Sequence, residues 1–460
     1  MLSKGILLLS HCGFFFMEDL IAALTARGLR SYVLSSQPLP EHVPARLDGL
    51  RGRVAWLGST RSHELAWDDV DHALAALRGA GEQVVACLTV WEGYREFMAR
   101  ANALLGVPDL ADSRVRALRD KLTLRNRLYD AGFSRARARR LSPELLGALR
   151  QEEGARYFIK PVSGIASQGA FPLRRDTRWE AIERIRNETE GDIVYRSALH
   201  PARDFLVEDY LEGREFSFEL IVAQGRVHAV GVHEKCEITE ASCTVLEDCC
   251  TSPPMGIGTT AVAAGMAWVQ RVFSHLGLDW GCFHVEARFD GRDWDLIEIN
   301  PRVGGSLVSH SVKALNGGHG VLELWIDLLT SHAGGMQGPT RGAQAFMARL
   351  QRLSYAADGT PPGDAATFFR AFFAKPGTLS QVSLRAMEPA PVLAQLLLKP
   401  GDDIATAARE VFLAQVLWRL GRQERDERLP ALIQQSRGAV EVHYARQGAP
   451  SPLSVERAAR

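Results

Sequence analysis

The segment Leu296-Ile-Glu-Ile-Asn-Pro-Arg302 constrains the fold of this chain more than any other stretch. Side chains two residues apart on a strand point to the same face, so Glu298 and Asn300 should project together. Glu286 lies on a predicted preceding strand, across a short turn at residues 289–293. The segment therefore predicts two neighbouring strands with three oxygen donors on one face, which suits Mg²⁺ bridging nucleotide phosphates.

The alternative for this segment is an antiparallel hairpin whose carboxylates are merely solvated. Leu296, Ile297 and Ile299 flank the carboxylates, and such apolar neighbours are unusual for a purely solvated edge. We therefore favour the metal site, with Glu286 and the carboxylate and amide of the second strand as its ligands.

Length and composition limit the function classes. The chain has 460 residues and a formal net charge of zero, which predicts several domains and no electrostatic bias toward nucleic acid or membrane. Its seven cysteines are odd in number and unevenly spaced, unlike a secreted disulfide framework. No apolar run approaches the ~20 residues of a membrane span, and the apolar start is followed by acidic residues rather than a cleavage site. We expect no nucleic-acid or membrane partner, and a cytoplasmic location by default.

Residues 1–115 predict a parallel α/β domain, because strands and helices alternate along them. Strands are expected at residues 6–10, 31–35, 53–57 and 83–88, and helices at 17–27, 67–78 and 91–105. The turn after the first strand lacks Gly-x-Gly-x-x-Gly, so dinucleotide binding there is not supported.

Residues 116–331 predict a second region, with a smaller mobile lobe over about 155–212. A basic helix at 114–131 is followed by strands at 156–159, 170–173, 204–207, 214–222 and 227–233, and by helices at 259–276 and 319–330. The stretch 236–258, which carries four cysteines, is expected to be a looser connection. Its spacings do not favour structural zinc, so these cysteines are interpreted as reduced thiols.

The remainder predicts a small α+β cap over residues 342–446. A Gly/Pro-rich run at 332–341 is expected to be the linker before it. Short strands are predicted at 343–349, 367–373 and 381–385, a helix at 404–420, and a disordered tail over 447–460.

A small-residue loop, Pro161–Gly169, follows the apolar strand that ends at Lys160. Free backbone N–H groups of such a loop can close over phosphates, and the lysine can supply a point charge. It is not a Walker loop, because Gly-Lys-Ser/Thr is missing and a strand follows. An ordinary hairpin loop with a solvated lysine is the alternative, and the loop alone does not decide between them.

Three further patterns are weaker by themselves. The strand and connection from Phe205 to Glu215 could offer backbone groups to an adenine and a carboxylate to a ribose. Lys121, at the start of the basic helix, could reach phosphate or belong to a solvated basic face. His233-Glu-Lys235 ends a strand but is not a His-Glu-x-x-His zinc motif.

Taken in order, these motifs resemble the ATP-grasp superfamily over roughly residues 80–330. The stretch 88–132, with Trp91-Glu92, Leu105-Gly106 and Asp120-Lys121, is similar to the ligases that join amino acids into dipeptides. The resemblance implies an ATP-grasp fold of mixed α/β and α+β class. It would have an N-terminal parallel α/β domain, a central two-lobed ATP-binding region and a C-terminal α+β cap.

The resemblance also implies a role for each matching residue. Phosphate binding would fall to Lys121, Lys160 and the loop residues Ser163, Gly164, Ser167 and Gly169. The adenine and ribose would be lined by Glu208, Tyr210, Leu211 and Glu215. Two Mg²⁺ ions, with Mn²⁺ as a substitute, would be bound by Glu286, Glu298 and Asn300. Catalysis and substrate binding would involve Arg302, Lys235, Gly304 and Gly305.

The implied activity is an ATP-dependent carboxylate–amine ligase that forms an acyl phosphate, ADP and then an amide between amino-acid-like substrates. A carboxylase-like enzyme that makes carboxyphosphate from bicarbonate, and a catalytically silent ATP-binding protein, are the alternatives. The intact metal and arginine set argues against the silent protein. The composition of residues 236–254 is unusual where such ligases place substrate-contacting loops, so the acid and the amine stay open. The oligomeric state is also open, with a homodimer the commonest state by base rate.

Overall fold

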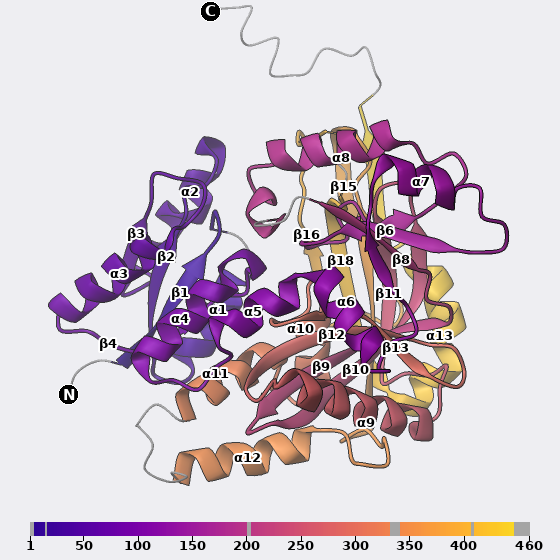
Figure 1. The fold of residues 1–460 in the computed structure, drawn as a ribbon. Coiled ribbons are helices and arrows are strands. Elements are labelled where there is room, and N and C mark those ends of the chain that lie inside the picture. Colours follow the sequence, from indigo (N-terminus) through magenta and orange to yellow (C-terminus); the bar gives the residue numbers. More distant parts are fainter. Residues whose placement is uncertain (1–3, 14–15, 200–203, 332–340, 406–408, 446–460) are drawn as a thin grey trace, which may run out of the picture.

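A computed structural model describes residues 4–13, 16–199, 204–331, 341–405 and 409–445, and its strands form four sheets. Figure 1 shows the N-terminal sheet on one side and the remaining sheets packed together on the other. Most of the predicted linker and all of the predicted tail at 447–460 lie outside the described residues.

The N-terminal domain is a parallel sheet with the strand order β3-β2-β1-β4. Its strands are β1 (Lys4–Ser10), β2 (Arg30–Ser35), β3 (Trp56–Ser59) and β4 (Gln83–Leu88). Its longer helices are α1 (Met17–Thr25), α3 (Trp67–Gly79) and α4 (Arg95–Leu105), with the short α2 (Val43–Arg46) and three 3₁₀ turns (Pro40–His42, Asp48–Leu50 and Glu92–Tyr94). Residues 6–9 of β1 are fully buried, as expected for a parallel strand covered on both faces. The predicted parallel α/β unit is confirmed.

The central and C-terminal regions share an eight-stranded sheet, ordered β13-β12-β9-β10-β11-β14-β18-β16. Its strands are β9 (Arg214–Ala223), β10 (Arg226–Glu240), β11 (Val245–Ser252), β12 (Gly281–Phe289), β13 (Trp294–Asn300), β14 (Ala365–Phe373), β16 (Leu393–Leu396) and β18 (Phe412–Gly421). Its helices are α9 (Thr259–Leu276), α10 (Val308–Leu315), α11 (Val321–Ser331), α12 (Arg341–Leu353) and α13 (Arg422–Ser436).

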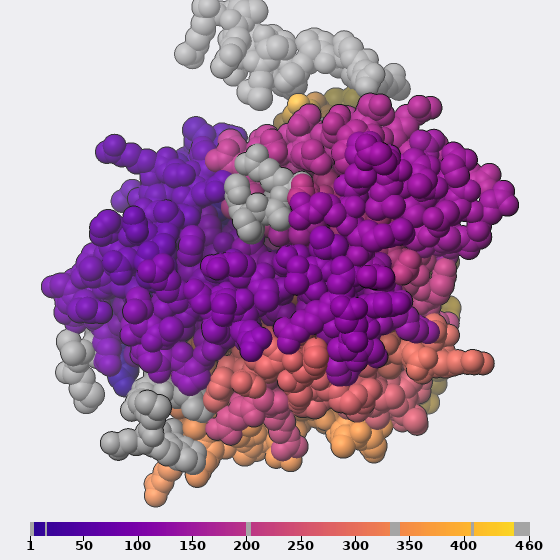
Figure 2. Space-filling view, in the orientation of Figure 1, coloured from indigo at the N-terminus to yellow at the C-terminus, as the bar shows by residue number. Residues whose placement is uncertain are grey.

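A smaller sheet forms the small lobe, in the order β5-β8-β6-β7. Its strands are β5 (Ala138–Arg140), β6 (Tyr157–Pro161), β7 (Phe171–Pro172) and β8 (Phe205–Asp209), with the helices α7 (Pro143–Leu149) and α8 (Trp179–Gly191) and a 3₁₀ turn at Arg196–Leu199. The helices α5 (Asp112–Arg119) and α6 (Lys121–Asp130) precede it. In Figure 2 the purple part of the chain that includes them runs across the middle of this face, between the indigo N-terminal domain and the magenta small lobe. A three-stranded sheet completes the C-terminal region, with β15 (Gly377–Leu384), β17 (Asp403–Ile404) and β19 (Val440–Tyr444).

Four predicted elements are wrong. Residues 343–349 are helical within α12, where Ala343, Phe346 and Leu350 are buried at helical spacing. The helix predicted at 404–420 is wrong, because residues 412–421 form the strand β18, which pairs with both β14 and β16. This pairing overrides the helix-favouring leucines and alanine of the segment. The predicted loose stretch at 236–258 contains the end of β10 and all of β11. The basic helix is interrupted at Asp120, whose side chain caps α6 by accepting a hydrogen bond from the Thr123 N–H at 3.0 Å.

No helix among the described residues has both the length and the apolar character that a membrane crossing needs.

Candidate active site

One face of the large sheet is polar where its first strands meet the small lobe. On β9, Phe216, Phe218 and Leu220 pack into the apolar core beside α9. The alternating residues of β9 face the other way and pair with their counterparts on β12, so that Glu215 lies opposite Arg288 and Glu219 opposite His284. The alternation of side chains along β9 therefore gives the strand one apolar face and one charged face.

The hairpin of β12 and β13 brings the predicted metal ligands together. Glu286 is directly opposite Glu298, and His284 is opposite Asn300. Asn300 donates a hydrogen bond from Nδ2 to Glu298 Oε1 at 2.7 Å. The hairpin is antiparallel, but its carboxylates do not lie on a solvated edge, since Glu286 is only 8% exposed and the side chain of Glu298 is 19% exposed. The donors are hard oxygen atoms of the kind that Mg²⁺ prefers, so the residues fit such an ion.

Two lysines already bring positive charge to these carboxylates. Lys121 Nζ lies 2.6 Å from Glu298 Oε2. The buried ammonium of Lys235 contacts Glu286 and Glu247, and lies 3.1 Å from Glu215 Oε1. Burial opposes ionisation of Glu286, but Lys235 and the neighbouring histidine outweigh it and hold its pKa well below the usual range. Glu286 is therefore an anion beside a buried ammonium.

A second charged group joins the small lobe to the hairpin. Lys160 Nζ lies 2.6 Å from Glu208 Oε1, and Arg125 Nε lies 2.8 Å from Glu208 Oε2. Both cations also donate to the carbonyl oxygen of Ile297, at 3.3 Å and 3.1 Å respectively. Burial lowers the pKa of Lys160 although Glu208 opposes the shift. Neither Lys160 nor Arg125 is a solvated surface cation. This contradicts the alternatives of a hairpin loop with a solvated lysine and of a helix with a fully solvated basic face.

A pocket lies between the small lobe and the hairpin and is lined by members of both charged groups, although Lys235 and Arg125 are not among its lining residues. Of the predicted site residues, it is lined by Lys121, Lys160, Ser167, Glu208, Tyr210, Leu211, Glu215, Glu286 and Glu298. Apolar walls come from Phe158, Ile165, Ala166, Ala170, Val245 and Ile297. The pocket thus combines an apolar slot with the ammonium groups of Lys121 and Lys160 and with several carboxylates.

The predicted phosphate loop borders this pocket only in part. Ser167 lines it, whereas Ser163 is buried and donates its hydroxyl to the Arg119 carbonyl at 3.2 Å. Gly164 is buried next to Ser163. Gly169, at φ +70°, donates its N–H to the Cys243 carbonyl at 3.0 Å. The turn between β10 and β11 is therefore fastened to the loop.

Arg302 lies just beyond the hairpin. Its Nε is 3.1 Å from Glu92 Oε2, a residue of the N-terminal domain, and its terminal nitrogen lies 3.5 Å from Asn300 Oδ1. Gly304 is pressed against His284, since a Cβ there would lie 2.8 Å from the imidazole Nδ1, while a Cβ on Gly305 would meet nothing within 4 Å among the described residues. Arg302 thus lies next to the metal candidate Asn300, and Gly304 lies against the histidine that is opposite Asn300 on the neighbouring strand.

Sequence reasoning missed two charged lining residues, Glu247 and Arg288. Arg288 shares the parity of Glu286, so the strand period could have revealed it. Glu247 comes from β11, within the stretch expected to be loose, and its carboxylate lies within 4.8 Å of those of Glu215 and Glu286. Burial among these acids raises the pKa of Glu247 despite the neighbouring Lys235. Glu247 reaches the pocket only because β11 pairs with β10, and no local sequence pattern predicts that pairing.

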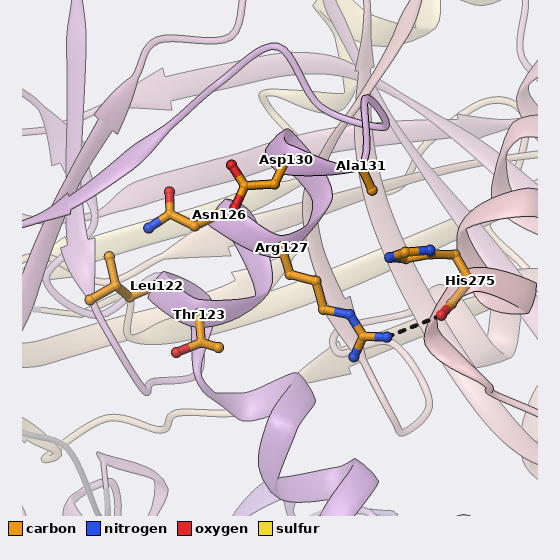
Figure 3. A pocket seen from close by; sticks show the side chains of 7 residues that line it. All are labelled: Leu122, Thr123, Asn126, Arg127, Asp130, Ala131 and His275. Carbon is orange, nitrogen blue, oxygen red and sulfur yellow. Dashed lines mark hydrogen bonds between the residues drawn. The ribbon is translucent and has the colours of Figure 1, made fainter.

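A separate open pocket lies on the outward face of α6, lined by Leu122, Thr123, Asn126, Arg127, Asp130, Ala131 and His275 (Figure 3). Figure 3 shows Arg127 reaching across to the His275 carbonyl, to which it donates at 3.1 Å. Lys121 and Arg125 are not among its lining residues, so this pocket is distinct from the charged site.

Comparison with known proteins identifies the fold. Residues 155–310 match the family model of the ATP-grasp domain. No curated protein sequence matches the chain significantly. Among solved structures, an L-amino acid ligase from Bacillus licheniformis is similar over 97% of this chain and 100% of its own, at 17% identity and a TM-score of 0.69.

Two further structures are similar at lower scores. Phosphoribosylglycinamide synthetase from Anaerococcus prevotii covers 96% of this chain with 100% of its own, at 15% identity and a TM-score of 0.62. The biotin carboxylase domain of a single-chain bacterial carboxylase covers 96% with 90% of its own, at 14% identity and a TM-score of 0.58. The chain therefore contains an ATP-grasp domain over residues 155–310, and its architecture is the ATP-grasp fold.

Proposed function

We propose that this protein is an ATP-dependent carboxylate–amine ligase that joins two amino-acid-like substrates through an acyl phosphate. One observation carries the proposal. A single pocket connects an apolar slot, the lysines Lys121 and Lys160 and the Glu286–Glu298 carboxylate pair, and Arg302 stands at the far end of the same hairpin, 3.5 Å from Asn300.

The nucleotide would lie in the slot between the lobes. Phe158 and Ile297 supply apolar surface for an adenine, and the connection after β8 supplies backbone groups near Tyr210. Lys121 and Lys160 line the same pocket, and their charges would meet the triphosphate. Ser167 lies on the phosphate loop, whose closure would keep water from the acyl phosphate.

Glu286, Glu298 and Asn300 would hold the divalent ions. When bound, Mg²⁺ would neutralise the phosphate charge that gathers during phosphoryl transfer. Lys235 lies among Glu215, Glu247 and Glu286, so its ammonium would keep this group of carboxylates from repelling the substrate acid.

Arg302 would act on the substrate side. The substrate carboxylate attacks the γ-phosphorus, and ADP leaves; the amine then attacks the acyl carbon, and phosphate leaves. The second step develops an oxyanion, which a fixed guanidinium stabilises without reorganisation. Glu92 holds Nε of Arg302 at 3.1 Å, so the N-terminal domain would orient this group.

The likeness to a biotin carboxylase domain keeps one competing activity in view, the formation of carboxyphosphate from bicarbonate. The likeness to an L-amino acid ligase is higher in both identity and TM-score, which favours amino-acid-like substrates. A silent ATP-binding protein is disfavoured by the complete set of carboxylates and Arg302.

The test is phosphate release from ATP and Mg²⁺ against a matrix of paired amino acids, with bicarbonate as a separate condition. We expect release only where an acid and an amine are both present, with a product lighter than the pair by one water. Release with bicarbonate alone would replace the ligase by the carboxylase, and ATP binding without release under any condition would contradict both.

A variant pair ties this activity to the site. Glu298→Ala should abolish release because it removes a metal ligand and the partner of Lys121. Glu153→Ala is the control, since that carboxylate lies on the small lobe with its side chain 89% exposed. Full activity in Glu298→Ala would contradict the metal assignment.

A further inference from the structure

A carboxylate without a role in the proposed reaction lies deep beside the metal candidates. Glu219 projects from the middle of β9 and its side chain is 0% exposed. Burying an ionised carboxylate is costly unless it is paired and hydrogen-bonded. Its oxygens accept hydrogen bonds from Ser217 Oγ at 2.9 Å and from His284 Nδ1 at 2.8 Å. The position therefore needs a physical reason beyond packing.

The reason lies on the other side of the histidine ring. His284 Nε2 is 3.3 Å from Glu286 Oε1, so the imidazole stands between two carboxylates. Glu219 and His284 are direct partners across β9 and β12, and Glu286 follows His284 by two residues on the same face. Gly304 closes the ring in from the side, because a Cβ there would lie 2.8 Å from Nδ1. The ring consequently has little freedom to turn.

We propose that Glu219 is a positioning residue that fixes His284 and, through it, holds the Glu286 carboxylate in the orientation that binds a divalent ion. This inference rests on the proposed metal site. A histidine hydrogen-bonded to a carboxylate on its far side is a common way to orient groups around a metal, and losing such an outer partner typically weakens metal binding by about 10–100-fold. Here the histidine orients a ligand instead of being one.

Lys235 does not make this support redundant. It contacts Glu286 too, but its ammonium is shared with Glu215 and Glu247. A lysine ammonium is a point charge without a preferred plane. The imidazole, by contrast, has a fixed ring direction once Nδ1 is bonded to Glu219, so it specifies where the carboxylate oxygen lies.

The test is binding of Mn²⁺, followed by its electron paramagnetic resonance signal, to protein saturated with ADP. Glu219→Gln keeps the size of the side chain but removes the charge behind His284. We expect its Mn²⁺ dissociation constant to rise by about 10–100-fold, with the ADP affinity measured without metal unchanged. Glu323→Gln is the matched control, a buried acid of α11 that pairs with Lys313 at 2.6 Å, and it should bind Mn²⁺ like the wild type.

The outcomes separate the inference from the function on which it rests. Equal Mn²⁺ affinity in Glu219→Gln and wild type would overturn the positioning role and leave the metal site standing. A lower melting temperature with unchanged Mn²⁺ affinity would do the same, because it marks a merely structural role. Absence of Mn²⁺ binding to the wild type would overturn the metal site as well. Should Glu219→Gln fail to fold, His284→Gln answers the same question, since it removes the contact to Glu286.

Discussion

Removing Arg125 should destabilise the protein because this guanidinium holds three segments together in a buried place. It is only 2% exposed and pairs with Glu208 at 2.8 Å. It also donates to Ser134 Oγ and to the Ile297 carbonyl, each at 3.1 Å. Removing one partner of a buried ion pair typically costs about 3–5 kcal/mol. Lys160 would still neutralise Glu208 in Arg125→Met, so we expect the lower end, about 3 kcal/mol.

The same geometry predicts non-additive losses. Glu208→Gln should cost more, about 5 kcal/mol, because it leaves Arg125 and Lys160 close together without their shared anion. Adding Arg125→Met to Glu208→Gln removes one of the two cations that have lost Glu208, of which Arg125 keeps only the more distant Asp295, at 3.6 Å. The double variant should therefore be more stable than Glu208→Gln alone, although each single change is destabilising.

Urea denaturation followed by circular dichroism would measure these differences. Arg127→Met is the control, since Arg127 lies on the exposed side of the same helix and should change the stability by no more than about 0.5 kcal/mol. A loss below about 1 kcal/mol for Arg125→Met would fall in the range of exposed pairs and refute the reasoning. A double variant whose loss equals the sum of the single losses would refute the shared-anion geometry.

Other consequences follow from single groups. Arg302→Met should lower kcat by about 10²–10³-fold with little change in the KM for ATP, as steady-state phosphate release would show; a loss confined to KM would contradict its catalytic role. Gly304→Ala should cost about 1–3 kcal/mol by forcing a Cβ against His284, whereas Gly305→Ala should be near neutral in the same melting experiment. Burial lowers the pKa of His11 from 6.5 to about 4. Between pH 4 and pH 6.5 the His11 imidazole is neutral in the folded protein and protonated in the unfolded chain. The free energy of unfolding should therefore fall by about 3 kcal/mol as the pH drops from about 6.5 to about 4. His11→Gln should remove that part of the pH dependence of urea denaturation, and an unchanged profile would contradict a buried neutral imidazole.

Strand periodicity accounts for much of what could be read from the sequence. The parallel N-terminal sheet and the ATP-grasp fold follow from local alternation and from motif order. The neighbouring strands that carry Glu286 and Glu298 follow from the short turn at residues 289–293, and the shared face of Glu298 and Asn300 follows from the period of two along a strand. These are signals carried within a few residues of each other.

What could not be predicted depends on pairing between distant segments. The strand β18 has a helix-favouring composition and becomes a strand only through β14 and β16. Glu247 enters the pocket only because β11 pairs with β10. The burial of Arg125 likewise depends on a carboxylate that lies 83 residues further along the chain. Basic helices are usually solvated, so nothing local distinguishes this arginine from Arg127.

The formation of an acyl phosphate is the central claim, and isotope transfer tests it most directly. An acid substrate labelled with ¹⁸O in its carboxylate should pass one labelled oxygen to the released phosphate for each amide formed, with ADP as the other product. Mass spectrometry of the phosphate would show this. Labelled oxygen in AMP, or unlabelled phosphate despite amide formation, would contradict attack of the carboxylate on the γ-phosphorus and with it the mechanism proposed for this site.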